Sequence, residues 1–243
     1  VRKQGRHPGR LRSLIYGGVS LVILLLAVFW LPGALARYAS NIIPEETRDS
    51  IGARLAADVE RLTGAHCEDP AALAALDRLA RRLFPNGTPQ VLVLPSALET
   101  TQHLPGGTLL ASHKLVEDFE TVEVLAGYLL AENLRRQSFD PFERLLRGAG
   151  LKAAFGLLTT GDINEDDLRA HAEALIVAEP AQLAGDHLAA QFVQSEVEPD
   201  AYVTAATPPA QSSELLKNAS AQIPTFPLLT DSEWIALQQI CET

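Results

Sequence analysis

Residues 103–133, HLPGGTLLASHKLVEDFETVEVLAGYLLAEN, hold the run of turn, strand and helix from which we predict the fold. Pro105-Gly106-Gly107 predicts a tight turn, and TLLAS, residues 108–112, predicts a short strand. The segment that follows is rich in acidic residues, namely Glu117, Asp118, Glu120 and Glu123. Acidic side chains stabilise the positive end of a helix dipole, so we expect a helix over residues 118–136.

Helical patterns predominate on both sides of this stretch. Before it, apolar residues at helical spacing predict helices over 44–62 and 70–84, and QVLVLP predicts a strand over 90–95. After it, similar patterns predict helices over 141–158, 164–178, 180–196, 199–206 and 232–241. The proline-rich runs 207–213 and 223–227 predict irregular connections. This order predicts an α+β domain that is mostly helical, with a small two- or three-stranded sheet.

The N-terminal region has the features of a membrane anchor. Residues 14–31 form 18 consecutive uncharged positions, about the minimum that spans a bilayer core. Five basic residues and no acidic residue precede them: Arg2, Lys3, Arg6, Arg10 and Arg12. The positive-inside rule therefore predicts a single-pass transmembrane helix with a cytoplasmic N-terminus and the remaining chain exported. The alternative is a signal peptide cleaved near Ala36, because Ala34-Leu35-Ala36 fits a processing site.

The exported part is strongly acidic. All 30 Asp and Glu residues and 15 of the 20 Lys and Arg residues follow residue 36, which gives a formal charge of −15. Such a charge repels phosphate backbones, so we expect no nucleic-acid partner. It also disfavours adsorption of the domain on anionic lipids, so we expect residues 14–31 to hold the protein at the membrane.

The two cysteines of the chain, Cys67 and Cys241, lie near opposite ends of the exported part. In an oxidising compartment an even pair of this kind predicts a disulfide. A metal site that uses His66 and Cys67 is less favoured, since no second pair of ligands follows at a suitable spacing.

The helix predicted over 118–136 has the surroundings of a zinc-binding helix. An HExxH motif places two histidines four residues apart on one helical face, with a glutamate that activates a zinc-bound water. The run LPGGTLLASHKLVEDFETVEVLAG resembles the segment that leads into this motif in the HtpX-like zinc metallopeptidases of the HExxH gluzincin type, which include periplasmic assembly-enhancing proteases. The resemblance extends over roughly residues 44–206 and implies a zincin-like fold.

The resemblance ends at the catalytic positions. Gly127 stands at the position of the first histidine, Tyr128 at that of the catalytic glutamate and Ala131 at that of the second histidine. In QLAGDHLAA, Gln182 replaces the third ligand, whereas Asp186 matches the family pattern. Glutamine is a poor zinc ligand because it is neutral. We therefore expect no metal and no cofactor at these positions, and a close packing contact on the face of Gly127 and Ala131.

The resemblance implies a catalytically inactive, metallopeptidase-like protein, anchored in the inner membrane of a bacterial envelope with its domain in the periplasm. We expect a stub and anchor over residues 1–36, a peptidase-like domain over 37–206, and a tail over 207–243 that packs back on it. In the active family the strand after the hairpin is an edge strand that binds substrate. By analogy, a protein or peptide partner would pair with residues Thr108, Leu109, Leu110, Ala111 and Ser112.

Two alternatives remain. One is an active, metal-dependent peptidase with unorthodox ligands, for which His103 and His113 on the two arms of the hairpin, or His187 beside Asp186, are the candidates. The other is a structural module unrelated to peptidases. The sequence contains no G-x-S-x-G elbow, P-loop or glycine-rich dinucleotide turn that would favour another chemistry.

Overall fold

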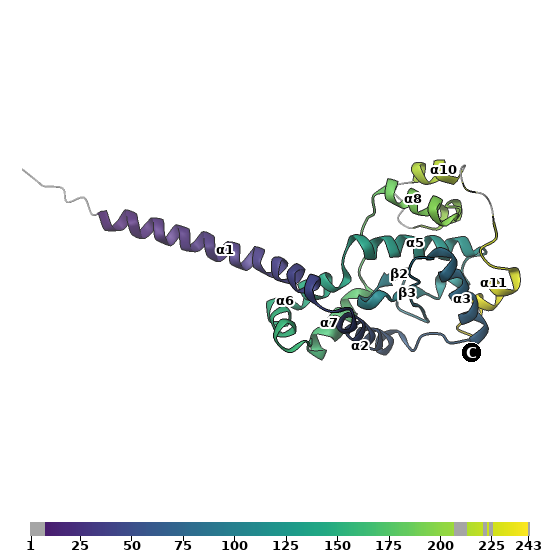
Figure 1. The fold of residues 1–243 in the computed structure, drawn as a ribbon, viewed down its shortest axis with the longest axis horizontal. Helices are drawn as coiled ribbons and strands as arrows, with labels where there is room; N and C mark the ends of the chain where they lie inside the picture. Colours follow the sequence, from purple (N-terminus) through teal and green to yellow (C-terminus); the bar gives the residue numbers. More distant parts are fainter. Residues whose placement is uncertain (1–7, 207–212, 221–222, 224–225, 243) are drawn as a thin grey trace, which may run out of the picture.

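The computed structural model describes residues 8–206, 213–220, 223 and 226–242. These form a mostly helical unit around a small mixed sheet, as the sequence predicts, and a long N-terminal helix leaves this unit as a rod (Figure 1). The elements are α1 (Pro8–Ile42), α2 (Glu45–Thr63), α3 (Pro70–Leu83), β1 (Val91–Leu94), β2 (Thr101–His103), the 3-10 turn η1 (Pro105–Gly107), β3 (Leu109–Ser112), α4 (Lys114–Glu117), α5 (Val122–Ser138), α6 (Pro141–Thr160), α7 (Glu165–Ile176), α8 (Gly185–Ser195), α9 (Asp200–Ala205), α10 (Ser213–Ser220) and α11 (Asp231–Gln238).

The sheet has the order β1-β3-β2, so β3 is its central strand. β1 pairs with β3 in parallel, from Val91 opposite Leu109 to Leu94 opposite Ser112. β2 pairs with the other edge of β3 in an antiparallel ladder, and η1 connects the two strands. The expectation that residues 108–112 form an edge strand open to a partner is therefore wrong. Both backbone edges of β3 are already paired, and β2 occupies the edge beside α5.

α5 is the central helix of the unit and is buried over most of its length. Figure 1 shows it between the sheet on one side and α8 with α10 on the other. Its buried residues run without a break from Val124 to Asn133. A helix that is apolar on all sides is typical of a fully enclosed position, and here only Glu132 and Asn133 interrupt the apolar surface.

α1 and α6 pack against each other in antiparallel orientation. Arg37 lies 3.8 Å from Glu143, and Gly33 lies against the guanidinium of Arg147. Ala36 and Ala39 are fully buried in the core cluster that includes α6. The boundary expected between residues 36 and 37 therefore falls inside α1, whose last two turns are part of the folded unit.

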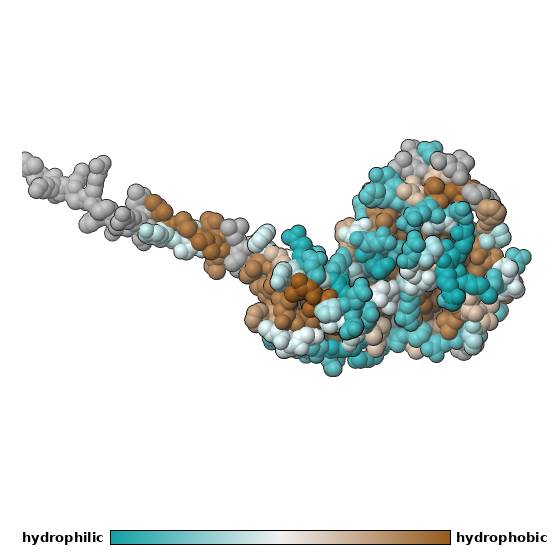
Figure 2. All heavy atoms as spheres, viewed as in Figure 1, coloured by the Kyte–Doolittle hydropathy of each residue, from teal (hydrophilic) through white to brown (hydrophobic). Residues whose placement is uncertain are grey.

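The part of α1 before this contact extends away from the unit (Figure 1), and its described side chains over residues 15–25 are exposed and mostly apolar (Figure 2). Among the described helices, α1 alone is long and apolar enough to cross a membrane: its stretch Ile15–Ile42 contains an 18-residue window with a mean hydropathy of 2.5. The basic residues Arg2, Lys3 and Arg6 lie outside the described residues, as do most of the connections expected at 207–213 and 223–227.

The disulfide predicted between Cys67 and Cys241 is present, with a Cα–Cα distance of 4.9 Å. It joins the segment after α2 to the residue that follows α11, so the C-terminal helix folds back against α3 and α4. Leu237 and Ile240 are buried in the main core. The Trp234 indole donates a hydrogen bond of 3.0 Å to the Glu120 carbonyl.

Candidate functional site

The face of α5 that would carry the zinc ligands is closed by an aromatic side chain. Tyr202 of α9 packs directly on Gly127, where an added Cβ would lie 2.5 Å from the Tyr202 Cβ and 2.7 Å from its Cγ. The Tyr128 and Tyr202 rings make an edge-to-face contact with centroids 5.1 Å apart. The close packing predicted at Gly127 is present, and a tyrosine from another helix provides it.

The two other positions of the degenerate motif lie elsewhere. Gln182 precedes α8, because this helix begins at Gly185 and not at residue 180 as the sequence suggested. The side chains of Gln182 and Asp186 are exposed, whereas Gly127 and Ala131 are buried. Within the described part of the chain, no three His, Cys, Asp or Glu side chains come together in a way that could hold a metal ion.

The histidines expected to face each other across the hairpin lie at its opposite ends. In the β2–β3 ladder His103 is opposite Leu109, while His113 follows Ser112 at the far end of β3. His113 pairs with Glu117 at 2.7 Å near the surface. His187 is exposed on α8. The antiparallel register therefore separates these candidate ligands.

A buried polar cluster lies one residue beyond Ala131, at Glu132. The Glu132 carboxylate is 1% exposed and accepts a short hydrogen bond from His103 Nδ1. It also accepts hydrogen bonds from Thr101 Oγ1 at 3.1 Å and from Arg135 at 2.8 Å. Burial alone would raise the pKa of Glu132, but the His103 hydrogen bond and the Arg135 charge outweigh it and lower the pKa. Glu132 is therefore an ionised, buried carboxylate.

His103 has one ring nitrogen engaged and one without a partner. Its side chain is 3% exposed, and Nε2 has no hydrogen-bond partner among the described residues. A buried polar atom of this kind is costly unless a ligand or water satisfies it. With Nδ1 engaged by Glu132, Nε2 is the ring nitrogen that faces the pocket without a partner.

Arg144 of α6 lies beside this histidine and has no direct ion pair in the described structure. Its Nη2 donates a long hydrogen bond of 3.4 Å to the His103 carbonyl, and its buried Nε has no partner. Burial lowers the pKa of Arg144, partly offset by attraction to Glu132. The pKa of His171 is lowered to about 4, mainly by burial and to a smaller extent by the positive charge of Arg144. The charge of Arg144 therefore also acts on this second histidine.

His103, Glu132 and Arg144 line a pocket of about 390 Å³. The pocket lies between β2, the C-terminal end of α5, the N-terminal end of α6 and the segment before α8. Three of its acidic side chains already have an arginine partner: Glu132 has Arg135 at 2.8 Å, Glu143 has Arg147 at 2.6 Å, and Asp140 has Arg48 at 3.2 Å. Among the described residues, Arg144 is thus the arginine of the pocket that has no ion pair. Phe139, Pro180 and Ala181 contribute apolar surface to the same pocket. The arrangement suits a small anionic group attached to an apolar body.

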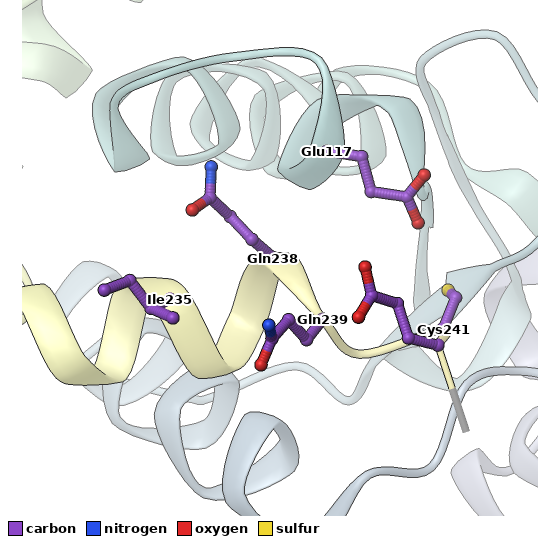
Figure 3. A pocket seen from close by; sticks show the side chains of 6 residues that line it. Glu117, Ile235, Gln238, Gln239 and Cys241 are labelled. Atoms are coloured by element: carbon purple, nitrogen blue, oxygen red, sulfur yellow. The ribbon is translucent and has the colours of Figure 1, made fainter.

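A second pocket, of about 510 Å³, lies between α4 and α11 beside the disulfide (Figure 3). Two of its polar side chains already have partners: Glu117 pairs with His113, and Gln238 donates to the Phe119 carbonyl at 3.2 Å. Its lining residues Glu117 and Glu242 are acidic and exposed. No unsatisfied buried group points to a ligand there, so the pocket beside His103 is the better candidate.

The sequence analysis singled out His103 but not Glu132, Arg135 or Arg144. One signal was available: Tyr128, Glu132 and Arg135 lie four and three residues apart, on a single face of a helix whose first half is mostly apolar. Comparison of the chain with protein-family models and with curated protein sequences gave no match.

Proposed function

We propose that this chain is a membrane-anchored binding protein that lacks peptidase chemistry and holds a partner protein or peptide by a carboxylate. The carboxylate would enter the pocket between β2, α5 and α6. The observation that carries the proposal is the buried, unpartnered donor Arg144 Nε at this pocket, beside the unpartnered ring nitrogen His103 Nε2. An incoming carboxylate satisfies the guanidinium with a charge-assisted hydrogen bond, for which arginine is well suited.

The chain is proposed to act from the inner membrane with its domain in the periplasm. Three features support this: the apolar, exposed length of α1, the basic residues before it, and a disulfide typical of an oxidising compartment. A retained anchor is favoured over cleavage near Ala36, because that residue is fully buried inside a continuous helix.

Descent from an HtpX-like peptidase is part of the proposal, and the hairpin, strand and buried helix in this order support it. The competing candidate is a structural module unrelated to peptidases, and the lack of room beside Gly127 favours it. A metal-dependent peptidase is a weaker candidate, because its proposed ligands His103, His113 and His187 lie in three separate places in the described structure.

Retention of defined peptide pools by the purified full chain tests the binding proposal. The first pool contains apolar tetrapeptides with free C-terminal carboxylates, the second the same peptides amidated, and the third amidated peptides that carry one glutamate. We expect about tenfold or greater retention of both carboxylate pools over the neutral pool, since a charged hydrogen bond contributes about 1.5–3 kcal/mol. Equal retention of all three pools would favour the structural module.

Arg144→Gln should abolish this preference, because it removes the positive charge that has no ion pair among the described residues of the pocket. Arg144→Lys keeps the charge without the planar fork and should retain part of it. The matched control is Arg169→Gln on α7, an exposed arginine that pairs only with Asp166 at 3.1 Å. If Arg144→Gln folds, as judged by circular dichroism, and still prefers the carboxylate pools, Arg144 is not the binding group.

A further inference from the structure

The second half of α6 carries apolar side chains that nothing in the described structure covers. α6 is broken at Gly150, where φ is +83°, and the helix resumes in a new direction over residues 151–160. Phe155 is 65% exposed and Leu151 is 39% exposed. They are four residues apart, so they lie on one face of this half-helix. Ala154 and Leu157, on its other face, are buried in the core.

The antiparallel packing of α1 and α6 fixes where this face begins. Arg37 lies opposite Glu143, and Gly33 lies opposite Arg147. Each step toward the N-terminus of α1 therefore matches a step toward the C-terminus of α6, with a rise of about 1.5 Å per residue in both helices. Three residues before Gly33, Trp30 is level with the start of the second half of α6. Figure 1 shows the bend of α6 as the part of the unit that reaches furthest along α1.

Trp30 and Leu31 end the uncharged run of α1. Tryptophan is enriched at the membrane–water interface, so this level is where a bilayer surface would lie if α1 spans it. Arg147 beside Gly33 agrees with this boundary, because its charge belongs on the aqueous side. Lys152, which is exposed between Leu151 and Phe155, suits the level of the lipid phosphates.

We infer that the second half of α6 is a membrane-surface contact: Leu151 and Phe155 insert into the boundary between headgroups and acyl chains, next to the point where α1 enters the bilayer. The inference rests on the proposed spanning role of α1. The occupant is the lipid bilayer, because this apolar face begins at the level of the exposed Trp30 and Leu31 of α1. The contact would fix the orientation of the pocket relative to the membrane despite the acidic charge of the domain as a whole.

Tryptophan fluorescence in brominated vesicles tests this inference. The full chain carrying Trp30→Phe is reconstituted in phosphatidylcholine with bromines at shallow (6,7) or deep (11,12) acyl positions. A single probe is then added: Phe155→Trp at the proposed contact, Leu24→Trp in the middle of α1, or Ile235→Trp on α11. Ile235 is the matched control, because it is 55% exposed and its helix, α11, lies at the end of the unit far from α1 (Figure 1). The remaining Trp234 is buried and provides a constant background.

We expect at least twofold quenching of Trp at 155 by shallow bromines and less by deep ones. The probe at 24 should be quenched more by deep bromines, and the probe at 235 by neither. If position 24 is quenched but position 155 is not, the surface contact is wrong and the span stands. If neither is quenched, the span itself is wrong. A blue-shifted, unquenched probe at 155 that depends on the ratio of protein to lipid would assign this face to a second copy of the chain and overturn the inference.

Discussion

Gly127 is the residue at which helix propensity and tertiary packing conflict. Alanine in a helix is more stable than glycine by about 1 kcal/mol, so the propensity alone would favour Gly127→Ala. However, the new Cβ would lie 2.5 Å from the Tyr202 Cβ, which the backbone fixes and no side-chain rotation can move, and within 3 Å of Cγ and Cδ2 as well. Overpacking of this kind costs about 1–3 kcal/mol. We therefore expect Gly127→Ala to lower the free energy of unfolding, as measured by chemical denaturation.

The control for this prediction is Gly156→Ala in α6. Nothing lies within 4 Å of a Cβ added at Gly156, so only the helix propensity acts there. We expect this variant to be more stable than the wild type by up to about 1 kcal/mol. Two variants of identical chemistry would thus shift stability in opposite directions. A Gly127→Ala protein as stable as Gly156→Ala would mean that Tyr202 does not pack on α5.

Glu132 should give the protein a characteristic loss of stability in acid. Its pKa is lowered in the folded state from an ordinary value of 4.5. A carboxyl group of this kind stabilises the folded state above its unfolded pKa, and the contribution is lost as the pH falls through the folded value. Glu132→Gln should cost about 3 kcal/mol near neutral pH, because it leaves His103 and Arg135 without their buried charge partner.

The difference in unfolding free energy between wild type and Glu132→Gln should shrink as the pH is lowered below 4.5. Denaturant unfolding over a pH series measures this directly. Glu173→Gln, which changes an exposed glutamate of α7, is the control and should follow the wild type throughout. A constant difference at every pH would show that the carboxylate of Glu132 is not the source of the effect.

At the scale of single elements, sequence periodicity predicts most helices and two of the three strands to within a few residues. β1, β3, α2, α3 and α7 lie close to their predicted ranges, because each has a clear apolar face or run and a cap or turn at its end. β2 is missed: TQH carries polar residues that are buried only because Glu132 and the Ala178 carbonyl satisfy them. Burial of polar side chains by distant partners leaves no local signal.

The errors at element ends have similar tertiary causes. The helix expected from residue 118 begins at Val122, and residues 114–117 form the separate short helix α4. The carbonyls of Phe119 and Glu120, between the two helices, accept hydrogen bonds from Gln238 and Trp234 of α11. A contact between residues more than 110 positions apart thus sets where α5 begins, and no local sequence pattern encodes it.

For the molecule as a whole, the sequence predicted an α+β fold, an apolar N-terminal helix and a disulfide, but only one residue of the candidate site. The candidate site forms only where three elements meet: β2 at the sheet edge, the last turns of α5 and the start of α6. Strand order is a tertiary property, and the expectation of a free edge at 108–112 failed for that reason. His103 was only a candidate ligand of the alternative, metal-dependent peptidase, and its carboxylate partner, 29 residues away, could not be identified from spacing.

The disulfide ties the two ends of the folded unit together and should stabilise the whole of it. Cys67 and Cys241 are 174 residues apart, and closing so long a loop stabilises by about 5 kcal/mol in the chain-entropy model. We expect the variant Cys67→Ser/Cys241→Ser to lose several kcal/mol of unfolding free energy. The wild type unfolded in the presence of dithiothreitol should lose the same amount.

The helix α11 should nevertheless remain docked when the disulfide is removed. Trp234, Leu237 and Ile240 hold it through buried apolar contacts, and the Trp234 indole hydrogen bond is independent of the cysteines. The loss should therefore appear in global unfolding, while amide hydrogen exchange of α11 stays no faster than that of α3, against which it packs. Faster hydrogen exchange in α11 alone, with global stability unchanged, would mean that the disulfide stabilises only the docking of the C-terminal helix. In that case the chain-entropy account would be wrong for this protein.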